Sequence, residues 1–388
     1  MLKLLHLKNK LPKLFFKPSL KKILIYDNEG SKYISRYLKK ESYDILHTRT
    51  EKLSILVIFK CIIKLKFKRK AYIEEYIKLV QPKLIITFID NNKSFYNLKK
   101  ISSAKTLFIQ NGIRTCFNDI FFYTFDSNMK LFPEIKQNNF AVDYMLVWND
   151  RVGKLYNKFI DGECISIGSF RNNFLIKKEI PKKNKVILFI SNFKNINKSK
   201  KINGIGRYWN FIKNEKKFLN LFREYCLAND FQIHILGKHS SEKIKERQYY
   251  NKFFSSLKNY KFIPADSSRT DYSIPIKYNF IVTIESSLGH EMLCQKKRVA
   301  FFSTHEDTYP LNSLYFDWMG KKKKIGPFWT NRLTKLDIKK ILDFLTQSSH
   351  FEWMKELNKY KSNLINIDQN NKKFLQIIKR ENLEECLK

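Results

Sequence analysis

Short runs of β-branched and other apolar residues alternate with segments of helical character along most of this chain. The alternation predicts parallel α/β units, because a strand buried on both faces is apolar throughout and a helix must return the chain to the next parallel strand. The expected strands are residues 22–26, 43–48, 84–89, 106–109, 143–148, 164–167, 186–190, 231–236, 261–264, 279–284 and 298–302.

The pattern is interrupted at the lysine-rich segment 177–185, which contains Pro181 and is typical of a linker. A chain of 388 residues is long enough for two domains. We therefore expect an α/β protein with two doubly wound, Rossmann-like domains facing a cleft. The expected division is a basic amphipathic leader at 1–20, an N-terminal domain at 21–176, a C-terminal domain at 185–335 and C-terminal helices at 336–388.

One long helix is expected over residues 51–79, and its stretch 53–67 is mostly apolar. Lys60, Lys64 and Lys68 follow one another at intervals of four, so they share one face of a helix. Such a helix either lies in a membrane interface or covers the sheet while its lysines extend to water. The sequence leaves both interpretations open.

The charge is strongly basic, with 74 Lys and Arg against 36 Asp and Glu, a net charge of +38. It indicates an anionic partner, or it reflects coding bias, since Lys, Asn, Ile and Phe are all abundant. We expect no nucleic acid, because the charge is spread along the chain and is mostly Lys.

The six cysteines form no CxxC pair, which favours free thiols in a reducing compartment. No uninterrupted apolar run reaches the ~18 residues of a membrane span.

Residues after the strands of the C-terminal half suit a phosphate. Small hydroxyl residues and glycine at the start of a helix allow close approach of an anion to backbone amides. A cationic pair follows a second strand, and a serine follows a third. The expected nucleotide-binding residues are Ser191, Lys238, His239, Glu285, Ser286, Ser287, Gly289 and Glu291. The alternative for each of them is a helix cap or a solvated turn.

Carboxylates and amides follow the strands of the N-terminal half and suit a sugar or polyol. A carboxylate at such an edge can act as general base toward an acceptor hydroxyl. The candidates are Asp27, Glu29 and Asp90, with Asn91, Asn92, Gln110, Asn111, Gly112 and Arg114 as the expected acceptor-binding residues. Caps and turns are again the alternative for any single carboxylate.

Several known motifs are absent: GxGxxG after a strand, the P-loop and GxSxG. His234 and His239 are spaced poorly for a metal and lack supporting ligands. The lysines at 321–324 form either an anion-binding loop or a solvated loop.

Seven segments in order resemble bacterial surface-carbohydrate, or O-antigen, biosynthesis proteins, a GT-B glycosyltransferase branch similar to CDP-glycerol glycerophosphotransferases and Kdo transferases. They are ITFIDNN (86–92), FIQNGIR (108–114), VDYMLVWND (142–150), IGSFRNN (167–173), ESSLGHE (285–291), VAFFS (299–303) and GPFWTN (326–331). The resemblance implies a GT-B-like fold, a nucleotide-sugar held by the C-terminal domain, no metal and no cofactor. It also implies a cytoplasmic enzyme acting on lipid-linked acceptors at the inner membrane face.

The chain departs from the glycerophosphotransferases at Asn111-Gly112, where those relatives carry His-Gly. An asparagine takes up no proton at neutral pH, so Asp90, or Glu29 by analogy with the Kdo transferases, becomes the candidate catalytic base.

The expected function is therefore transfer of a sugar from a nucleotide-sugar to a lipid-linked or glycan acceptor in surface polysaccharide (O-antigen or lipopolysaccharide) biosynthesis. One alternative is a CDP-polyol phosphotransferase. Another is a non-catalytic protein that uses its basic charge to bind nucleic acid or a membrane surface. Peripheral contact with the membrane through basic segments is expected in the first case.

Overall fold

The computed structural model describes residues 16–49, 51–113, 140–174, 185–193, 205–238, 241–257, 259–265, 273–284, 286–302, 325–330 and 332–388. The chain forms two compact units, which we treat separately. Unit 1 comprises residues 1–174 and 366–388, and unit 2 comprises residues 175–365.

Unit 1 is built on a six-stranded parallel sheet in the order β2-β1-β3-β4-β5-β6. Its strands are β1 (Ile23–Tyr26), β2 (Tyr43–Leu46), β3 (Leu84–Thr87), β4 (Lys105–Ile109), β5 (Phe140–Val147) and β6 (Ile160–Ser166). β1 and β3 are buried at every residue, as expected for strands covered on both faces. The order is that of a flavodoxin-like doubly wound sheet.

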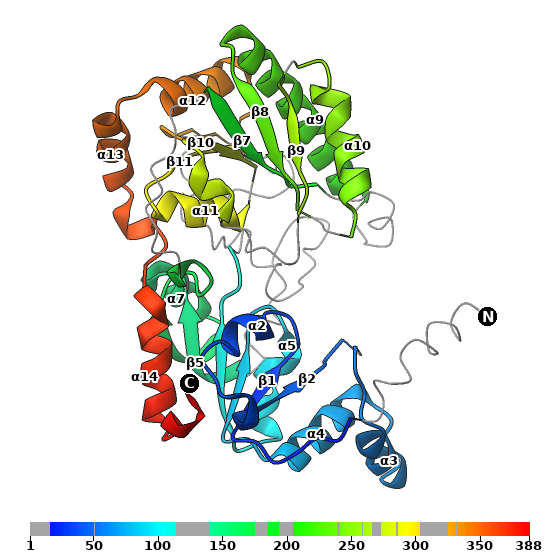
Figure 1. Cartoon of the computed structure of the whole chain (residues 1–388). Helices are drawn as coiled ribbons and strands as arrows, with labels where there is room; N and C mark the ends of the chain where they lie inside the picture. The colour runs from blue at the N-terminus through cyan, green and yellow to red at the C-terminus, as the bar shows by residue number, and fades with distance from the viewer. Residues whose placement is uncertain are drawn as a thin grey trace, which may run out of the picture. The chain divides into compact units, whose positions relative to one another are not determined.

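The helices of unit 1 include one that comes from the end of the chain. They are α2 (Ser31–Ile34), α3 (Ile55–Ile63), α4 (Arg69–Val80), α5 (Lys93–Tyr96), α7 (Asp150–Tyr156) and α14 (Lys372–Arg380). α14 places Phe374, Ile377 and Ile378 in one apolar core with Ile23 and Ile86 of the sheet. Figure 1 shows this helix, in red, alongside the strands of unit 1.

The C-terminal segment 336–388, expected as one set of helices, is divided between the two units. Residues 366–388 return to unit 1, where the Asn371 amide donates to the Phe170 carbonyl at 2.9 Å and its carbonyl oxygen accepts from Asn173 at 2.6 Å. Both asparagines are buried. The core of unit 1 is therefore complete only when residues 366–388 pack against it.

The single long helix expected over 51–79 is wrong, because the chain forms the two helices α3 and α4 instead. The break lies at Leu65, whose φ of 53° belongs to the left-handed region that ends helices. The reversal lets α3 pack against α4, so that Val57 and Cys61 are buried. A continuous helix would carry those side chains away from α4.

Unit 2 contains a second six-stranded parallel sheet, in the order β12-β11-β10-β7-β8-β9. Its strands are β7 (Val186–Ile190), β8 (Gln232–Leu236), β9 (Lys261–Ile263), β10 (Phe280–Thr283), β11 (Arg298–Phe302) and β12 (Trp329–Thr330). With β7 as the first strand, this is the strand order of the Rossmann fold. The expected fold class, two doubly wound parallel sheets, is confirmed.

The helices of unit 2 are α9 (Ile205–Ala228), α10 (Lys243–Phe254), α11 (Ser287–Cys294), α12 (Lys335–Gln347) and α13 (His350–Asn358). α9 contacts both α10 and α12, while α11 contacts β10 and β11. α9 begins at Ile205 and includes Gly206 in its first turn. A glycine in the first helical turn costs only about 1 kcal/mol, which 24 residues of helix easily offset.

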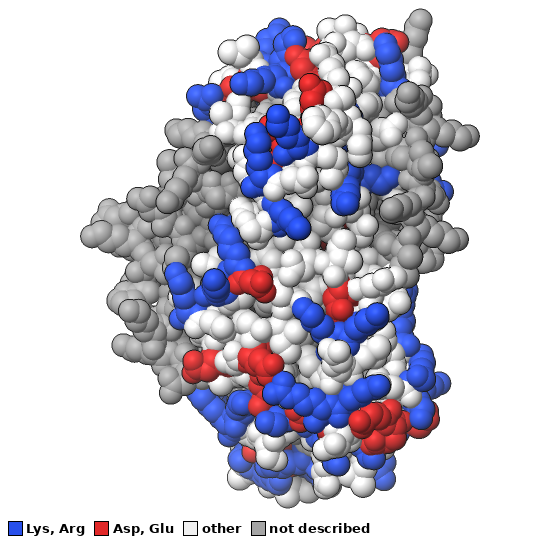
Figure 2. Space-filling view, turned by 90° about the vertical axis from the view of Figure 1, so that its left-hand side faces the viewer, with Lys and Arg blue, Asp and Glu red and all other residues white. Residues whose placement is uncertain are grey.

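The basic side chains do not gather in one place on the face shown in Figure 2. Lys and Arg lie there among Asp, Glu and uncharged residues rather than in one continuous stripe.

Within the described residues, no helix combines the length and apolar character needed to cross a membrane. Of the predicted free thiols, Cys61, Cys226, Cys294 and Cys386 are buried and Cys164 is partly exposed.

Candidate functional site

Each sheet has one point at which the chain reverses the direction in which it adds strands. In unit 1 this switch point lies between β1 and β3, and in unit 2 it lies between β7 and β10. Ligands of doubly wound proteins bind in the crevice outside the carboxyl ends of the strands at such points. The residues that follow these four strands are therefore the primary candidates for binding.

In unit 1, Asp27 follows β1 and adopts a φ of 87°, which is unusual for a residue other than glycine. Its carboxylate accepts a hydrogen bond from the Glu29 backbone N–H at 2.8 Å, which holds the turn closed. Gly30 has a φ of 74°, and a Cβ there would lie 2.4 Å from the Phe88 ring. The turn after β1 thus packs directly against the end of β3.

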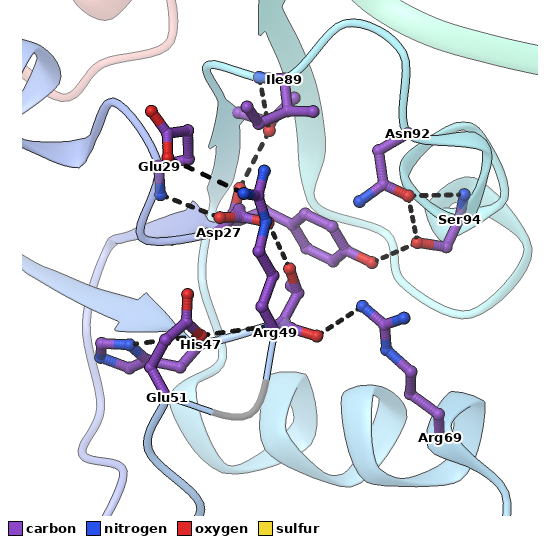
Figure 3. Close-up of polar contacts among 12 residues, drawn as sticks. Asp27, Glu29, His47, Arg49, Glu51, Arg69, Ile89, Asn92 and Ser94 are labelled. Atoms are coloured by element: carbon purple, nitrogen blue, oxygen red, sulfur yellow. Dashed lines mark hydrogen bonds and ion pairs between the residues drawn. The ribbon is translucent and has the colours of Figure 1, made fainter. Parts of the chain in front are cut away.

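Two residues just beyond β2, Thr48 and Arg49, donate to the same carboxylate. Figure 3 shows Arg49 beside Asp27. The Thr48 hydroxyl donates to Asp27 at 2.5 Å, and the Arg49 Nε donates to it at 3.3 Å. The Thr48 carbonyl accepts from the Arg69 guanidinium of α4 at 2.5 Å. Asp27 is buried, so these donors compensate the cost of removing its charge from water.

Glu29 and Asp90, the two expected catalytic carboxylates, have very different environments. The Glu29 side chain is 53% exposed and lies 3.8 Å from the Arg49 guanidinium. Asp90 is 0% exposed and accepts hydrogen bonds from the Tyr156 hydroxyl and, at 3.4 Å, from the Asn111 backbone N–H. Asp90 therefore joins the end of β3 to the end of β4 and to α7, whereas Glu29 is accessible from solvent.

The expected acceptor-binding residues follow β3 and β4. Two of them, Asn92 and Gln110, form hydrogen bonds with backbone groups. Asn92 caps α5 by accepting from the Ser94 backbone N–H and hydroxyl group, at 3.1 and 2.6 Å. Gln110 is buried, donates to the Gly112 carbonyl and accepts from the Trp148 backbone N–H, both at 2.9 Å. Asn91 and Asn111 are partly exposed, while Gly112 is buried. Arg114 lies outside the described residues.

In unit 2, the ends of β7 and β8 are joined by Glu246 of α10. The Ser191 hydroxyl and, at 2.8 Å, the Lys238 backbone N–H donate to this carboxylate. Tyr250 lies 2.9 Å from the Ser191 hydroxyl, and burial raises the pKa of Tyr250 so that it remains a neutral donor. Ser191 is buried, whereas the Lys238 side chain is exposed at the carboxyl edge of the sheet.

At the end of β10, Ser286 caps α11 by accepting from the Leu288 backbone N–H at 3.3 Å. Gly289 allows α11 to approach the sheet, because a Cβ there would lie 2.6 Å from Thr283 Cγ2. Ser287 is partly exposed, and Glu291 is buried within α11. Since β10, β7 and β8 are neighbours and parallel, Ser286, Ser191 and Lys238 lie at one edge of one sheet.

Three expectations remain without a structural account, because His239, Glu285 and the lysines at 321–324 lie outside the described residues. His234 lies 2.7 Å from the Tyr278 hydroxyl, and burial lowers the pKa of His234. The described residues contain no group of three or more His, Cys, Asp or Glu side chains that could hold a metal ion.

The sequence matches the model of a family described as "putative O-antigen biosynthesis protein" over residues 107–382, well over half of the chain. The chain belongs to this family of O-antigen biosynthesis proteins. The match begins in β4 and continues through α14, so it includes β5 and β6 of the first sheet, the whole second sheet and the C-terminal return to unit 1. Among curated proteins, no sequence is significantly similar to this chain.

Solved structures of low sequence identity share the fold across almost the whole chain. The UDP co-structure of S. aureus MnaA has a TM-score of 0.54 at 14% identity, covering 94% of this chain and 98% of that one. Methanocaldococcus jannaschii UDP-GlcNAc 2-epimerase, in complex with UDP-GlcNAc and UDP, has a TM-score of 0.51 at 13% sequence identity. The similarity covers 92% of this chain and 99% of that one. The wall teichoic acid polymerase TagF has a TM-score of 0.53 at 12% sequence identity, covering 99% of this chain and 96% of that one. The GT-B-like two-domain architecture expected from the sequence is thus confirmed.

Sequence reasoning missed several residues that organise these two edges. Glu246 lies in the first turn of α10, 55 residues from Ser191, and nothing local distinguishes it from a solvated glutamate. Thr48 was counted within the expected strand 43–48, whereas β2 ends at Leu46. Arg49 follows the expected strand directly, so the rule that located Asp27 and Glu29 applies to it equally. Arg69 begins α4 and does not follow a strand, so nothing in the sequence indicated that it would contact this edge.

Proposed function

We propose that this O-antigen biosynthesis family member is a glycosyltransferase that moves a sugar from a nucleotide-sugar to a lipid-linked or glycan acceptor. The observation that carries the proposal is the placement of Ser191, Lys238 and Ser286 at neighbouring strand ends around the Rossmann switch point of unit 2. Two proteins of similar fold were solved with UDP, one of them also with UDP-GlcNAc. The family match adds surface polysaccharide as the product class.

In this proposal the donor diphosphate lies at the carboxyl edge of the second sheet. Lys238 and His239 offset its negative charge, and the N-terminus of α11 with Ser286, Ser287 and Gly289 faces it. Glu285 accepts hydrogen bonds from ribose hydroxyls. Cationic side chains and helix dipoles then stabilise the departing diphosphate, which assigns the reaction to the metal-independent class.

The acceptor occupies the switch point of unit 1, among Asn91, Asn111 and Arg114. We assign the general base to Glu29 rather than Asp90, because the Glu29 carboxylate is accessible and Asp90 already accepts from Tyr156 and Asn111. A positioned base accelerates transfer by ~10²–10⁴-fold. Arg49, 3.8 Å from Glu29, orients the carboxylate. The protein acts in the cytoplasm, peripherally at the inner membrane face.

A thermal-shift screen against UDP-, CDP-, GDP- and dTDP-sugars tests the donor assignment. A ligand at 100 times its dissociation constant adds ~2.7 kcal/mol to stability, which raises the melting temperature by a few degrees. No shift with any nucleotide-sugar contradicts the proposal.

A second candidate is a CDP-polyol phosphotransferase, favoured by the similarity of fold to the teichoic acid polymerase TagF over 99% of this chain. Product analysis separates the two reactions. A phosphotransferase leaves a new phosphodiester and releases CMP, whereas a glycosyltransferase leaves a glycosidic bond and releases a nucleoside diphosphate.

A further inference from the structure

Helix α3 is apolar on almost every side, with the sequence ILVIFKCII and Lys60 as its one charged residue. One side packs against α4 through Val57 and Cys61, which are buried. A helix that is apolar all round is normally enclosed by protein or by lipid. In unit 1 only α4 among the described helices packs closely on α3, and Figure 1 shows α3 at the outer side of α4.

The uncovered side of α3 continues into the turn that follows it. The described part of the chain has twelve exposed large apolar side chains, and six of them fall within residues 55–67. These six define what we call the α3 surface: Ile55, Phe59, Ile62, Ile63, Leu65 and Phe67. Leu65 and Phe67 are 78% and 75% exposed. Positions 55, 59, 62 and 63 recur at helical spacing, so they form one continuous face.

The charged residues in the sequence segment that carries the α3 surface are all basic, although Lys64 among them pairs with Glu75 of α4. Residues 52–73 contain seven Lys or Arg and no Asp or Glu. Lys66 and Lys68, in the segment that joins α3 to α4, and Arg69 and Lys70, at the start of α4, are exposed. Exposed aromatic and aliphatic side chains with cations beside them match the layered chemistry of an anionic bilayer, where acyl chains lie beneath phosphates.

Unit 1 holds the α3 surface in a fixed orientation. The Lys64 ammonium donates to Glu75 of α4 at 2.7 Å, and the Ser54 backbone N–H donates to the Tyr72 hydroxyl at 2.9 Å. A cavity of about 350 Å³ lies beneath α3 and is lined by Ile62 and Phe67 together with Lys66 and Lys68. It offers apolar volume directly beside cationic groups.

We propose that the α3 surface docks unit 1 onto an anionic phospholipid bilayer. Phe59, Ile63 and Phe67 enter the acyl layer, and the lysines at 66, 68 and 70 lie at the phosphates. The proposal identifies the contact itself and does not depend on the transfer reaction, so it stands or fails separately from the enzymatic function.

Vesicle co-sedimentation of the full chain tests it, with phosphatidylcholine alone or mixed with phosphatidylglycerol. The full chain sediments with the mixed vesicles, and high salt weakens the binding. The triple variant Phe59→Ser, Ile63→Ser, Phe67→Ser binds at least ~10-fold more weakly, because each substitution removes apolar burial in the acyl layer. All three residues are exposed, so its melting temperature stays that of the parent.

Matched controls use the same chemistry elsewhere. Ile244→Ser, Leu336→Ser and Phe351→Ser remove exposed apolar side chains from unit 2 and leave vesicle binding unchanged. Lys66→Glu, Lys68→Glu and Lys70→Glu abolish the preference for phosphatidylglycerol, whereas Lys340→Glu, Lys355→Glu and Lys379→Glu, with the same change in net charge, reduce binding much less.

Three results overturn the proposal. The parent protein fails to bind either vesicle. The triple variant binds as tightly as the parent, which assigns binding to another segment such as residues 1–15. The parent forms a dimer without lipid that the triple variant does not form, which makes the α3 surface an interface between two copies.

Discussion

The Thr48 hydroxyl donates a hydrogen bond of 2.5 Å to the carboxylate of Asp27. Both residues are buried, and they follow the neighbouring parallel strands β2 and β1. The bond therefore fixes the turn that carries Glu29 relative to the edge of the sheet. The arrangement of the residues at this edge of the sheet therefore depends on a hydrogen bond between two side chains as well as on the pairing of the strands.

Replacement of Thr48 by Val tests this role. Val keeps the shape but removes the donor, which leaves the buried Asp27 carboxylate with a lost hydrogen bond worth ~1–3 kcal/mol. Thr48→Val should lower the free energy of unfolding by that amount in urea denaturation. Thr48→Ser retains the hydroxyl and should lose less than Val; equal losses would show that the methyl group, not the bond, matters.

Glu29→Gln should abolish most transfer without affecting the fold. The side chain is 53% exposed, so the unfolding free energy stays within ~0.5 kcal/mol of the parent, while turnover drops by ~10²–10⁴-fold. Initial rates with saturating donor are the measurement. Glu41→Gln, another exposed carboxylate of unit 1, should have no effect on the rate. Full activity in Glu29→Gln would return the base to Asp90.

Lys238→Ala should weaken nucleotide-sugar binding by roughly 10–100-fold, the equivalent of one charge-assisted hydrogen bond. Calorimetric titration measures the dissociation constant directly. Lys243→Ala, which removes an exposed lysine at the start of α10, serves as the control for lost net charge. The assignment of Lys238 to the diphosphate is excluded if both variants bind donor equally well.

Much of the fold could be predicted from the sequence because each buried parallel strand is a short apolar run. The pairing of α14 with the sheet of unit 1 could not, since it joins Phe374 to Ile23 across most of the chain. The division into α3 and α4 was missed because apolar and lysine residues continue through the break at Leu65. Strand-end reasoning located Asp27, Glu29, Ser191 and Ser286, whereas Glu246 acts through a tertiary contact that has no local signature.

The Lys64–Glu75 pair predicts a pH dependence of stability. The Lys64 hydrogen bond lowers the pKa of the buried Glu75 carboxyl. A lowered folded-state pKa stabilises the protein above the ordinary glutamate value of ~4.3, and the contribution is lost as pH falls through the lowered value. Glu75→Gln should therefore lower the free energy of unfolding at neutral pH and leave it unchanged in acid.

Urea denaturation of Glu75→Gln at several pH values measures this difference, with the exposed Glu384→Gln as the control that should show none. If the Glu75 variant loses the same stability at every pH, the pair contributes through packing and not through its charge.

Hydrogen exchange of the full chain, followed with and without nucleotide-sugars, tests the central claim most directly. We predict that a nucleotide-sugar slows exchange in the peptides that contain Ser191, Lys238 and residues 286–291, the three neighbouring strand ends of unit 2. Protection confined to other parts of the chain, or no protection with any nucleotide-sugar, would contradict the account.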